Sequence, residues 1–412
     1  MLVDLWKQAC EAMVYNRRRT MITMIGMAWG IATVVLLLAY GSGFGRAIEA
    51  IFAQWGTHLI GVFPGRTSEQ VGGSKAGVEV RLTKDDVERL ELTVPGVKHV
   101  TPLLSKDLPV ANELHTYTWT VNGYRPVVQD ILVLDVDTGR FFNDDDEANR
   151  AHVAVLGSEA KTKLFGGEYA IGRHIRLNGI SFEVIGVLQP KMQQEQSNNN
   201  RQVYIPLSAM GDLKDPKYYD GFWLNYNGDH AAVQQAIRNT LAELHNFRPS
   251  DHQAIFVADL EQQLTQFKIV VIALEALLLF IGALTLGIAG IGLMNIMLVA
   301  VQQRTKEIGI EKALGARKRH ILIQFLAESL VITGIGGALG IVLAYAVAIG
   351  VGRITFYSAM AAHAEAADIQ LLISPLIVVI ATGILIVVGL VSGMIPALKA
   401  ANLNPIEALR YE

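Results

Sequence analysis

The sequence contains little charge and almost no cysteine. Of its 412 residues, 18% are charged and 51% are hydrophobic, and the formal net charge is only -3. A soluble domain of this length rarely has so apolar a balance, so the composition indicates an integral membrane protein. The near-neutral charge gives no sign of a nucleic-acid partner. Because Cys10 is the single cysteine, no intramolecular disulfide can form, and any domain outside the membrane must be held by packing alone.

Motifs for common chemistry are also missing. The sequence has no G-x-x-x-x-G-K-[ST] phosphate loop, which excludes ATP hydrolysis by that route. Its histidines lack H-E-x-x-H or other metal spacing, and the acidic run Asn143–Glu147 does not continue into the D-x-[DN]-x-[DN]-G pattern of a calcium loop. Ser158 and Lys161 have the S-x-x-K spacing of penicillin-binding enzymes, but no K-T-G or S-D-N accompanies them. We therefore expect no catalytic residue, metal site or cofactor in this chain.

Four apolar stretches are long enough to cross a membrane, because a hydrocarbon core of roughly 30 Å needs about 20 residues of helix. The predicted spans are 20–41, 268–301, 321–351 and 371–398. The second is longer than a span requires, since a continuous helix over it would extend about 50 Å. We expect its outer part, with the residues just before it (259–280), to form a stiff stalk that continues into the preceding domain.

Basic residues predict the orientation of the spans, because lysine and arginine favour the cytoplasmic side. They cluster before the first span, after the second and after the fourth: Lys7, Arg17, Arg18, Arg19, Arg304, Lys306, Lys312, Arg317, Lys318, Arg319, Lys399 and Arg410. The link 352–370 carries only Arg353 and is expected outside. Both termini and the 302–320 loop are therefore expected inside, with 1–19 as an interfacial helix and 399–412 as a cytoplasmic tail.

Residues 42–267 are predicted to form a mixed α and β domain outside the membrane. Thr83 is a candidate N-cap, because acidic residues follow it in the first turn of a predicted helix. Asn178-Gly179 lies between two alternating apolar runs and predicts a hairpin turn. A further helix is expected over about 229–244, whereas the polar tract 189–202 is expected to be a loop or a disordered tip.

Four segments of the sequence resemble a known family. They include the first span with its flanks, "LDVDTGRFFNDDDEANRAHVAVLGSEAKTKLFGG", "GIGLMNIMLVAVQQRTKEIGIEKALGARKRHILIQFLAESLVITGIGGALGI" and "IPALKAANLNPIEALRYE". In order, spacing and topology these segments resemble the MacB/FtsX-type ABC transporter permeases over nearly the whole chain. The resemblance implies an integral membrane protein of the cell inner membrane, with four transmembrane helices and a large mixed α+β extracytoplasmic domain between the first two. A variable subdomain would be inserted at roughly 109–200.

The resemblance also implies a mechanism and a set of partners. Family members act as dimers, here a homodimer or a heterodimer with a paralogue, together with cytoplasmic ATPases that bind ATP and Mg. Many MacB proteins carry the ATPase in the same chain, so we expect a separate ATPase subunit here. Motion of the ATPases would move the stalk and outer domain, and the expected output is efflux of a hydrophobic compound or peptide through a periplasmic adaptor and an outer-membrane channel. Lipoprotein extraction, control of cell-wall hydrolases and a non-transporting sensor are the alternatives.

The charged run 304–316 is the expected site of ATPase coupling. On a helix, Ile310, Ala313 and Leu314 would share the side that packs on the bundle, and Ile308 would lie opposite them, exposed among charges. Such an anchor with a charged rim suits a protein-binding surface, and the resemblance implies a coupling helix in a groove of the ATPase. An ordinary topogenic loop is the alternative. The predicted coupling residues are Arg304, Lys306, Glu307, Ile308, Gly309, Glu311, Lys312 and Gly315.

Glu311 departs from the pattern that relatives commonly show. They have E-I-G-I-R-K-A where this chain has "EIGIEKA", so an acid replaces a base. A reversed charge at the rim of an interface changes partner choice more than the fold. We therefore expect a dedicated ATPase whose groove offers a base to Glu311.

Small and polar residues within the spans are predicted to hold helices together. Glycines let helices approach closely in lipid, either as generic packing or as a dimer seam. The predicted positions are Gly26, Gly30, Gly290, Gly336, Gly340, Gly389 and Gly393. Asn295 is expected to form an interhelical hydrogen bond, or else to cap a local helix distortion. Glu328, about two turns into the third span, is expected to pair with a nearby base rather than to relay protons.

Overall fold

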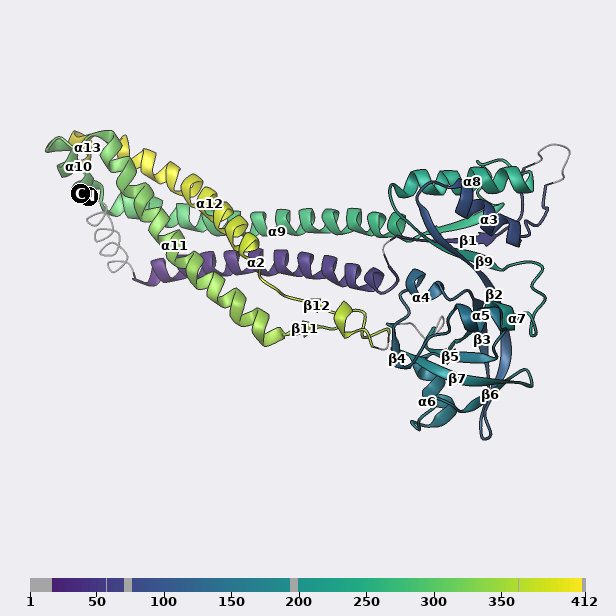
Figure 1. The fold of residues 1–412 in the computed structure, drawn as a ribbon. Coiled ribbons are helices and arrows are strands. Elements are labelled where there is room, and N and C mark those ends of the chain that lie inside the picture. Colours follow the sequence, from purple (N-terminus) through teal and green to yellow (C-terminus); the bar gives the residue numbers. More distant parts are fainter. Residues whose placement is uncertain (1–16, 57, 70–75, 193–198, 362, 410–412) are drawn as a thin grey trace. The chain divides into compact units, whose positions relative to one another are not determined.

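The computed structural model describes residues 17–56, 58–69, 76–192, 199–361 and 363–409 (Figure 1). Of the predicted interfacial helix at 1–19, residues 1–16 lie outside the described residues. The polar tract at 189–202 is described at 189–192 and 199–202, and its residues 193–198 lie outside. The chain divides into two compact units. The helical unit comprises 1–46, 269–354 and 368–412, and the α/β unit comprises 47–268 and 355–367.

Four helices of the described chain are long and apolar enough to cross a membrane, as predicted. They are α2 (Arg17–Ala53), α9 (Leu260–Gln303), α11 (Lys318–Val351) and α12 (Pro375–Ala401). Shorter elements connect or follow them: α10 (Thr305–Ala313), β11 (Arg353–Ile354), η3 (Glu365–Ala367), β12 (Ile369–Gln370) and α13 (Pro405–Leu409). α9 continues without a break for 44 residues, which corresponds to about 66 Å. One helix therefore contains both the predicted stalk and the predicted second span.

The first long helix continues past the predicted end of its span, through the glycines of "GSGFG". Glycine weakens an isolated helix by roughly 1 kcal/mol, but here it permits close packing. A Cβ at Gly41 would lie 3.0 Å from Glu275 Cγ, and one at Gly45 would lie 3.1 Å from Val271 Cγ1. Tertiary contact with α9 thus decides that this segment stays helical.

The predicted packing glycines mostly contact neighbouring helices of the same chain. A Cβ at Gly30 would meet Leu286 of α9, and one at Gly290 would meet Ser392 and Val388 of α12. In the same way, Gly336 and Gly340 face α2, while Gly389 and Gly393 face Thr333 and Ser329 of α11. Gly26 has open space around it. Except for Gly26, these glycines therefore serve packing within one chain.

A ten-stranded mixed sheet forms the centre of the α/β unit, in the order β10-β1-β9-β2-β3-β8-β5-β7-β4, with β6 paired to β2 and β7. The strands are β1 (Leu59–Pro64), β2 (Val97–Ala111), β3 (Thr116–Tyr124), β4 (Val136–Gly139), β5 (Val153–Leu156), β6 (His174–Leu177), β7 (Ile180–Leu188), β8 (Val203–Pro206), β9 (Gly221–Tyr226) and β10 (Ile255–Asp259). The helices are α3 (Lys84–Thr93), α4 (Val128–Ile131), α5 (Asp144–Ala148), α6 (Ser158–Phe165), α7 (Leu207–Met210) and α8 (His230–His245), with a short turn η2 (Asn199–Arg201).

Local sequence signals in this unit are confirmed. Thr83 precedes α3, and its backbone N–H donates to Asp86 Oδ2 at 2.6 Å, as in a capping box. Asn178 and Gly179 both have positive φ, at 48° and 90°, and they connect β6 to β7. This is the geometry that a two-residue hairpin turn requires.

The long strand β2 joins two parts of the α/β unit. Its first half pairs with β9, and its second half pairs with β3. One apolar cluster lies around the first half and is covered by α3 and α8, with Leu90, Val100 and Ile237 fully buried or nearly so. A second cluster surrounds β3, β5, β7 and β8 and overlaps the predicted insertion at 109–200. The two parts therefore share a strand rather than a flexible linker.

Candidate functional site

The charged run forms α10, but the side that it buries is the reverse of the prediction. α10 follows α9 after a single residue, Arg304. Ile308 is 3% exposed and lies in an apolar cluster with residues of α9, α11 and α12. Ile310 is 50% exposed and Leu314 is 84% exposed. The prediction of an exposed Ile308 anchor is therefore wrong.

Two polar residues explain the reversal. Thr305 and Lys312 share the inner face of α10 with Ile308 and Gly309, at the spacing of one helix face. Thr305 Oγ1 donates to the carbonyl oxygens of Val301 (3.1 Å) and Gln302 (2.8 Å). Buried polar groups are tolerated when they are hydrogen-bonded. The prediction assigned the inner face to apolar residues only, and it therefore chose the wrong side of α10.

Lys312 reaches the end of the fourth long helix. Its ammonium donates to the carbonyl oxygens of Ala401 at 2.8 Å and Leu403 at 2.5 Å. Partial burial, and then the charge of Lys318, lower the pKa of Lys312. Lys312 is therefore engaged within the chain. The prediction that it is a free charge at the rim of a binding surface is wrong.

Arg304 and Glu328 form an ion pair, with 3.5 Å between Nη1 and Oε2. Both side chains are mostly buried. The pair holds the corner between α9 and α10 against α11, so Arg304 is also not available as a rim charge. Glu328 has a basic partner inside the chain, which is the structural pairing that its position in the sequence suggested.

The outward side of α10 and the turn after it carries the remaining predicted coupling residues. Lys306, Glu307 and Glu311 are exposed around Ile310 and Leu314. Gly315 has a φ of 100°, and its N–H donates to the Lys312 carbonyl, which closes the end of the helix. The surface therefore consists of two apolar side chains among charges of both signs. We call these five side chains the α10 surface.

Asn295 does not make the predicted interhelical hydrogen bond within the described chain. Its side chain is exposed on α9, and none of the described residues accepts from it or donates to it. The side chain faces away from the helices that it was expected to bridge. Sequence reasoning placed Asn295 in a span but could not tell which side of the helix faces the bundle.

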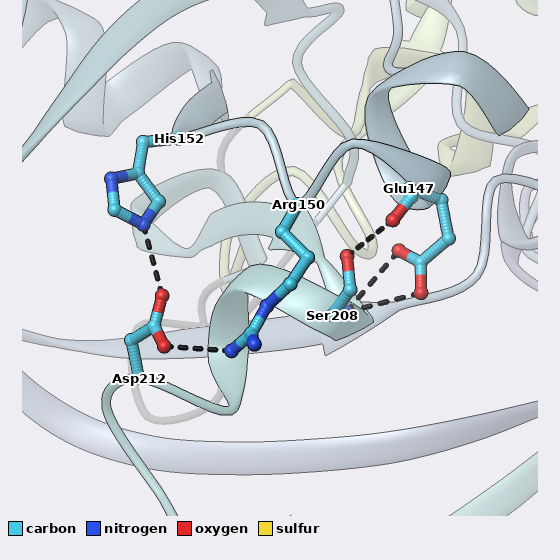
Figure 2. Close-up of polar contacts among 5 residues, drawn as sticks. All are labelled: Glu147, Arg150, His152, Ser208 and Asp212. Carbon is cyan, nitrogen blue, oxygen red and sulfur yellow. Dashed lines mark hydrogen bonds and ion pairs between the residues drawn. The ribbon is translucent and has the colours of Figure 1, made fainter.

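A second polar cluster lies in the α/β unit, where it contains a serine, a histidine and acids. Figure 2 shows His152 directed at Asp212, with 3.0 Å between Nε2 and Oδ2, and Arg150 at 2.8 Å from the same carboxylate. Ser208 Oγ donates to the Glu147 carbonyl at 2.7 Å. Nucleophilic catalysis needs the hydroxyl and its base in hydrogen-bond reach, and His152 is not paired with Ser208. The cluster instead joins α5, the start of β5 and α7.

We expect the contribution of Asp212 to depend on pH. The hydrogen bond to His152, and then the charge of Arg150, hold the pKa of Asp212 below its ordinary value despite the opposing effect of burial. A lowered pKa stabilises the fold above the unfolded value of about 3.9 and ceases to do so as pH falls through the folded value. Asp212→Asn should therefore speed hydrogen exchange in 150–156 and 207–213 near neutral pH, and the difference should disappear in strong acid.

Asp145→Asn is the matched control for this change, because Asp145 is exposed and its carboxylate makes no hydrogen bond to a described residue. Hydrogen exchange of the full-length protein would be compared for wild type and both variants. Faster exchange in Asp145→Asn, or a difference for Asp212→Asn that persists in acid, would contradict the assignment.

Comparison with known proteins identifies the family. Residues 20–240 match the family described as MacB-like periplasmic core domain, and residues 279–405 match FtsX-like permease C-terminal. Macrolide export ATP-binding/permease protein MacB of Bdellovibrio bacteriovorus is 33% identical over 420 residues, which cover 100% of this chain and 62% of the relative. Pyoverdine export ATP-binding/permease protein PvdT of Pseudomonas entomophila is 32% identical over 420 residues, which cover 100% and 60%.

A solved structure is also similar. The crystal structure of the periplasmic region of MacB from Actinobacillus actinomycetemcomitans matches 54% of this chain and 97% of its own, with 19% identity and a TM-score of 0.44. The chain spans about three fifths of the length of the two curated relatives named above.

The long apolar helices and the domain match define a multi-pass membrane protein with a mixed α/β periplasmic domain between the first and second spans. The chain belongs to the MacB-like family of ABC transporter permeases. The resemblance seen in the sequence is thereby confirmed.

Proposed function

We propose that this chain is the mechanotransmission subunit of a MacB-like ABC transporter, and that its α10 surface receives the movement of a separate cytoplasmic ATPase. In this arrangement both termini lie in the cytoplasm, and the partner ATPase binds ATP and Mg. The permease works as a dimer with a second copy or a paralogue. The observation that carries the proposal is the exposed pair Ile310 and Leu314 among Lys306, Glu307 and Glu311.

This surface has the composition of a protein-binding site. Apolar side chains that are exposed at the centre of a patch become anchors when a partner covers them, and charges at the rim fix orientation and partner choice. Glu311 is next to Ile310 in the chain, so a base in the ATPase groove would be drawn to this position. The proposal keeps the predicted coupling segment and moves its anchor from Ile308 to Ile310 and Leu314.

The connection between α10 and the periplasmic domain supports a mechanical role. α9 begins directly after β10 and runs unbroken to Gln303, and α10 follows after Arg304. A continuous helix transmits displacement along its axis, whereas a flexible loop would absorb it. Movement of α10 would therefore reach the first residues of α9 in the periplasmic domain.

The proposed output is export of a hydrophobic compound or peptide. The relatives named above are described as macrolide and pyoverdine exporters. A periplasmic adaptor and an outer-membrane channel would complete the path in a cell with an outer membrane. Lipoprotein extraction and hydrolase control are distinguished from export by the genes beside this one, since an adaptor gene would accompany an exporter.

We expect Leu314→Asp to prevent co-purification with the cognate ABC ATPase. Loss of a central anchor typically costs about 2 kcal/mol or more, or roughly 30-fold in affinity. Glu311→Arg should weaken assembly by a smaller factor, because rim charges mainly affect partner choice. Leu114→Asp is the matched control, since Leu114 is also 84% exposed but lies in the α/β unit. Assembly that is undiminished in Leu314→Asp, or equally lost in Leu114→Asp, would refute the proposal.

A further inference from the structure

The end of α12 is held by two lysines that lie on either side of one turn. Lys312, in the last turn of α10, binds the carbonyl oxygens of Ala401 and Leu403. Lys318, the first residue of α11, donates from Nζ to Asn402 Oδ1 at 3.2 Å. Three successive residues at the end of α12 thus accept hydrogen bonds from both ends of the segment 313–317, which contains the exposed Leu314.

The acceptors are groups that a helix end leaves available. The last carbonyl groups of a helix have no partner within it, and they carry the negative end of the helix dipole. Ala401 is the last residue of α12 and its carbonyl is one of these groups, whereas Leu403 lies just beyond the C-cap Asn402. An ammonium group is well suited to this position, because its charge complements the dipole and it can donate to both carbonyls at once.

The two lysines of α10, Lys312 and Lys306, lie on opposite sides of the helix. Lys312 shares the inner face with Ile308, which packs against α9, α11 and α12. Lys306 is exposed on the opposite side and makes no ion pair or hydrogen bond to a described residue. Figure 1 also shows α10 beside α13, and the two helices are in contact. The two lysines on one helix therefore have different surroundings.

We propose that Lys312 and Lys318 are positioning residues that clamp the segment 313–317, which contains Leu314, to the end of α12. A push on this segment would then move the fourth span together with α9. The inference rests on the proposed function, because the segment is pushed only if an ATPase binds there. It adds a second route for the motion. α9 receives it through the chain itself, whereas α12 receives it through the two lysine contacts.

The first test measures the clamp without any ATPase. In a Cys10→Ser background, spin labels would be attached to cysteines at Ala313 and Ile406, both exposed in the structure. Lys312→Met keeps the length of the side chain and removes its donors, so it should weaken or broaden the spin–spin coupling between the labels. Lys306→Met should leave the coupling unchanged, and Lys312→Arg should restore most of it. Unchanged coupling in Lys312→Met would overturn the inference.

The second test measures transmission in the full complex with the ATPase. The readout is the ATP-driven change in hydrogen exchange of residues 369–380, at the start of α12, divided by the change in residues 260–268 of α9, which receives the motion without the clamp. This ratio should fall roughly tenfold in Lys312→Met, which corresponds to about 1.4 kcal/mol, near the value of one charge-assisted hydrogen bond. Assembly should persist, since Leu314 is intact. A ratio equal to wild type would overturn the inference.

The two tests separate this inference from the proposed function. If spin–spin coupling responds to Lys312→Met but wild type binds no ATPase, the clamp stands and the proposed function fails. If wild type binds and drives the ATPase but neither readout responds to Lys312→Met, the clamp fails and the proposed function stands. Rescue by Lys312→Arg distinguishes loss of the clamp from misfolding.

Discussion

Ile308→Asp is expected to destabilise the helical unit, whereas Ile310→Asp should leave it folded. Ile308 is buried among residues of three long helices, so an aspartate there would place a charge without a partner in an apolar cluster. Such changes cost about 4 kcal/mol or more. Ile310 is half exposed, and a surface change usually alters the free energy of unfolding by about 0.5 kcal/mol or less. Denaturant titration of both variants in detergent would measure the difference.

Binding of the ATPase provides a second measurement for the same pair of variants. Ile310→Asp should yield a folded permease that binds the ATPase poorly, because it alters the α10 surface. Ile308→Asp should also bind the ATPase poorly, but only because α10 no longer packs against α9, α11 and α12. Hydrogen exchange of residues 290–330 should therefore rise in this variant. If Ile308→Asp were as stable as wild type and Ile310→Asp were unfolded, the buried and exposed sides of α10 would have to be exchanged.

Gly340→Ala is expected to weaken the contact between α11 and α2. A Cβ at this position would overlap Ile31 Cγ2 and the backbone carbonyl oxygen of Ala28. A side chain can rotate away, but a backbone carbonyl cannot, so the helices must separate. Overpacking of this kind typically costs about 1–3 kcal/mol, and we expect the upper part of this range. The free energy of unfolding can be measured by titration with sodium dodecyl sulfate in mixed micelles.

Gly334→Ala is the matched control on the same helix. Gly334 is exposed and has no atom within 4 Å of an added Cβ. Alanine is also the better helix former, by up to about 1 kcal/mol. The control should therefore be neutral or slightly stabilising. Equal destabilisation by both changes would show that α11 responds to the loss of glycine itself and not to a close contact with α2.

Much of the fold follows from short-range features of the sequence. The four spans are identified by length and hydropathy, and the turn at Asn178-Gly179 by the residues that its backbone geometry demands. The capping box at Thr83 and Asp86 follows from three-residue spacing. These features are local, because each depends on residues within one or two turns of the chain. The family was also recognisable from motifs whose order and spacing extend over most of the chain.

The candidate site shows where local reasoning fails. Hydrophobic spacing allowed two phases for α10, and the apolar residues Ile310 and Leu314 favoured the wrong one. The correct phase depends on Lys312, whose partners lie about ninety residues further along the chain, at the end of α12. Arg304 is a similar case. It is predicted to be a rim charge, but it pairs with Glu328 of α11, a partner that local spacing does not reveal.

The sequence by itself determined that this is a membrane protein with four spans, a large mixed domain between the first two and a charged segment between the second and third. Hydrophobic length and local turn chemistry are sufficient for these conclusions. Only the tertiary structure decided which side of α10 faces outward, that Lys312 is bound to the end of α12, and that six of the seven predicted glycines pack within one chain. Those outcomes depend on which distant groups satisfy a buried polar atom or fill the space beside a glycine.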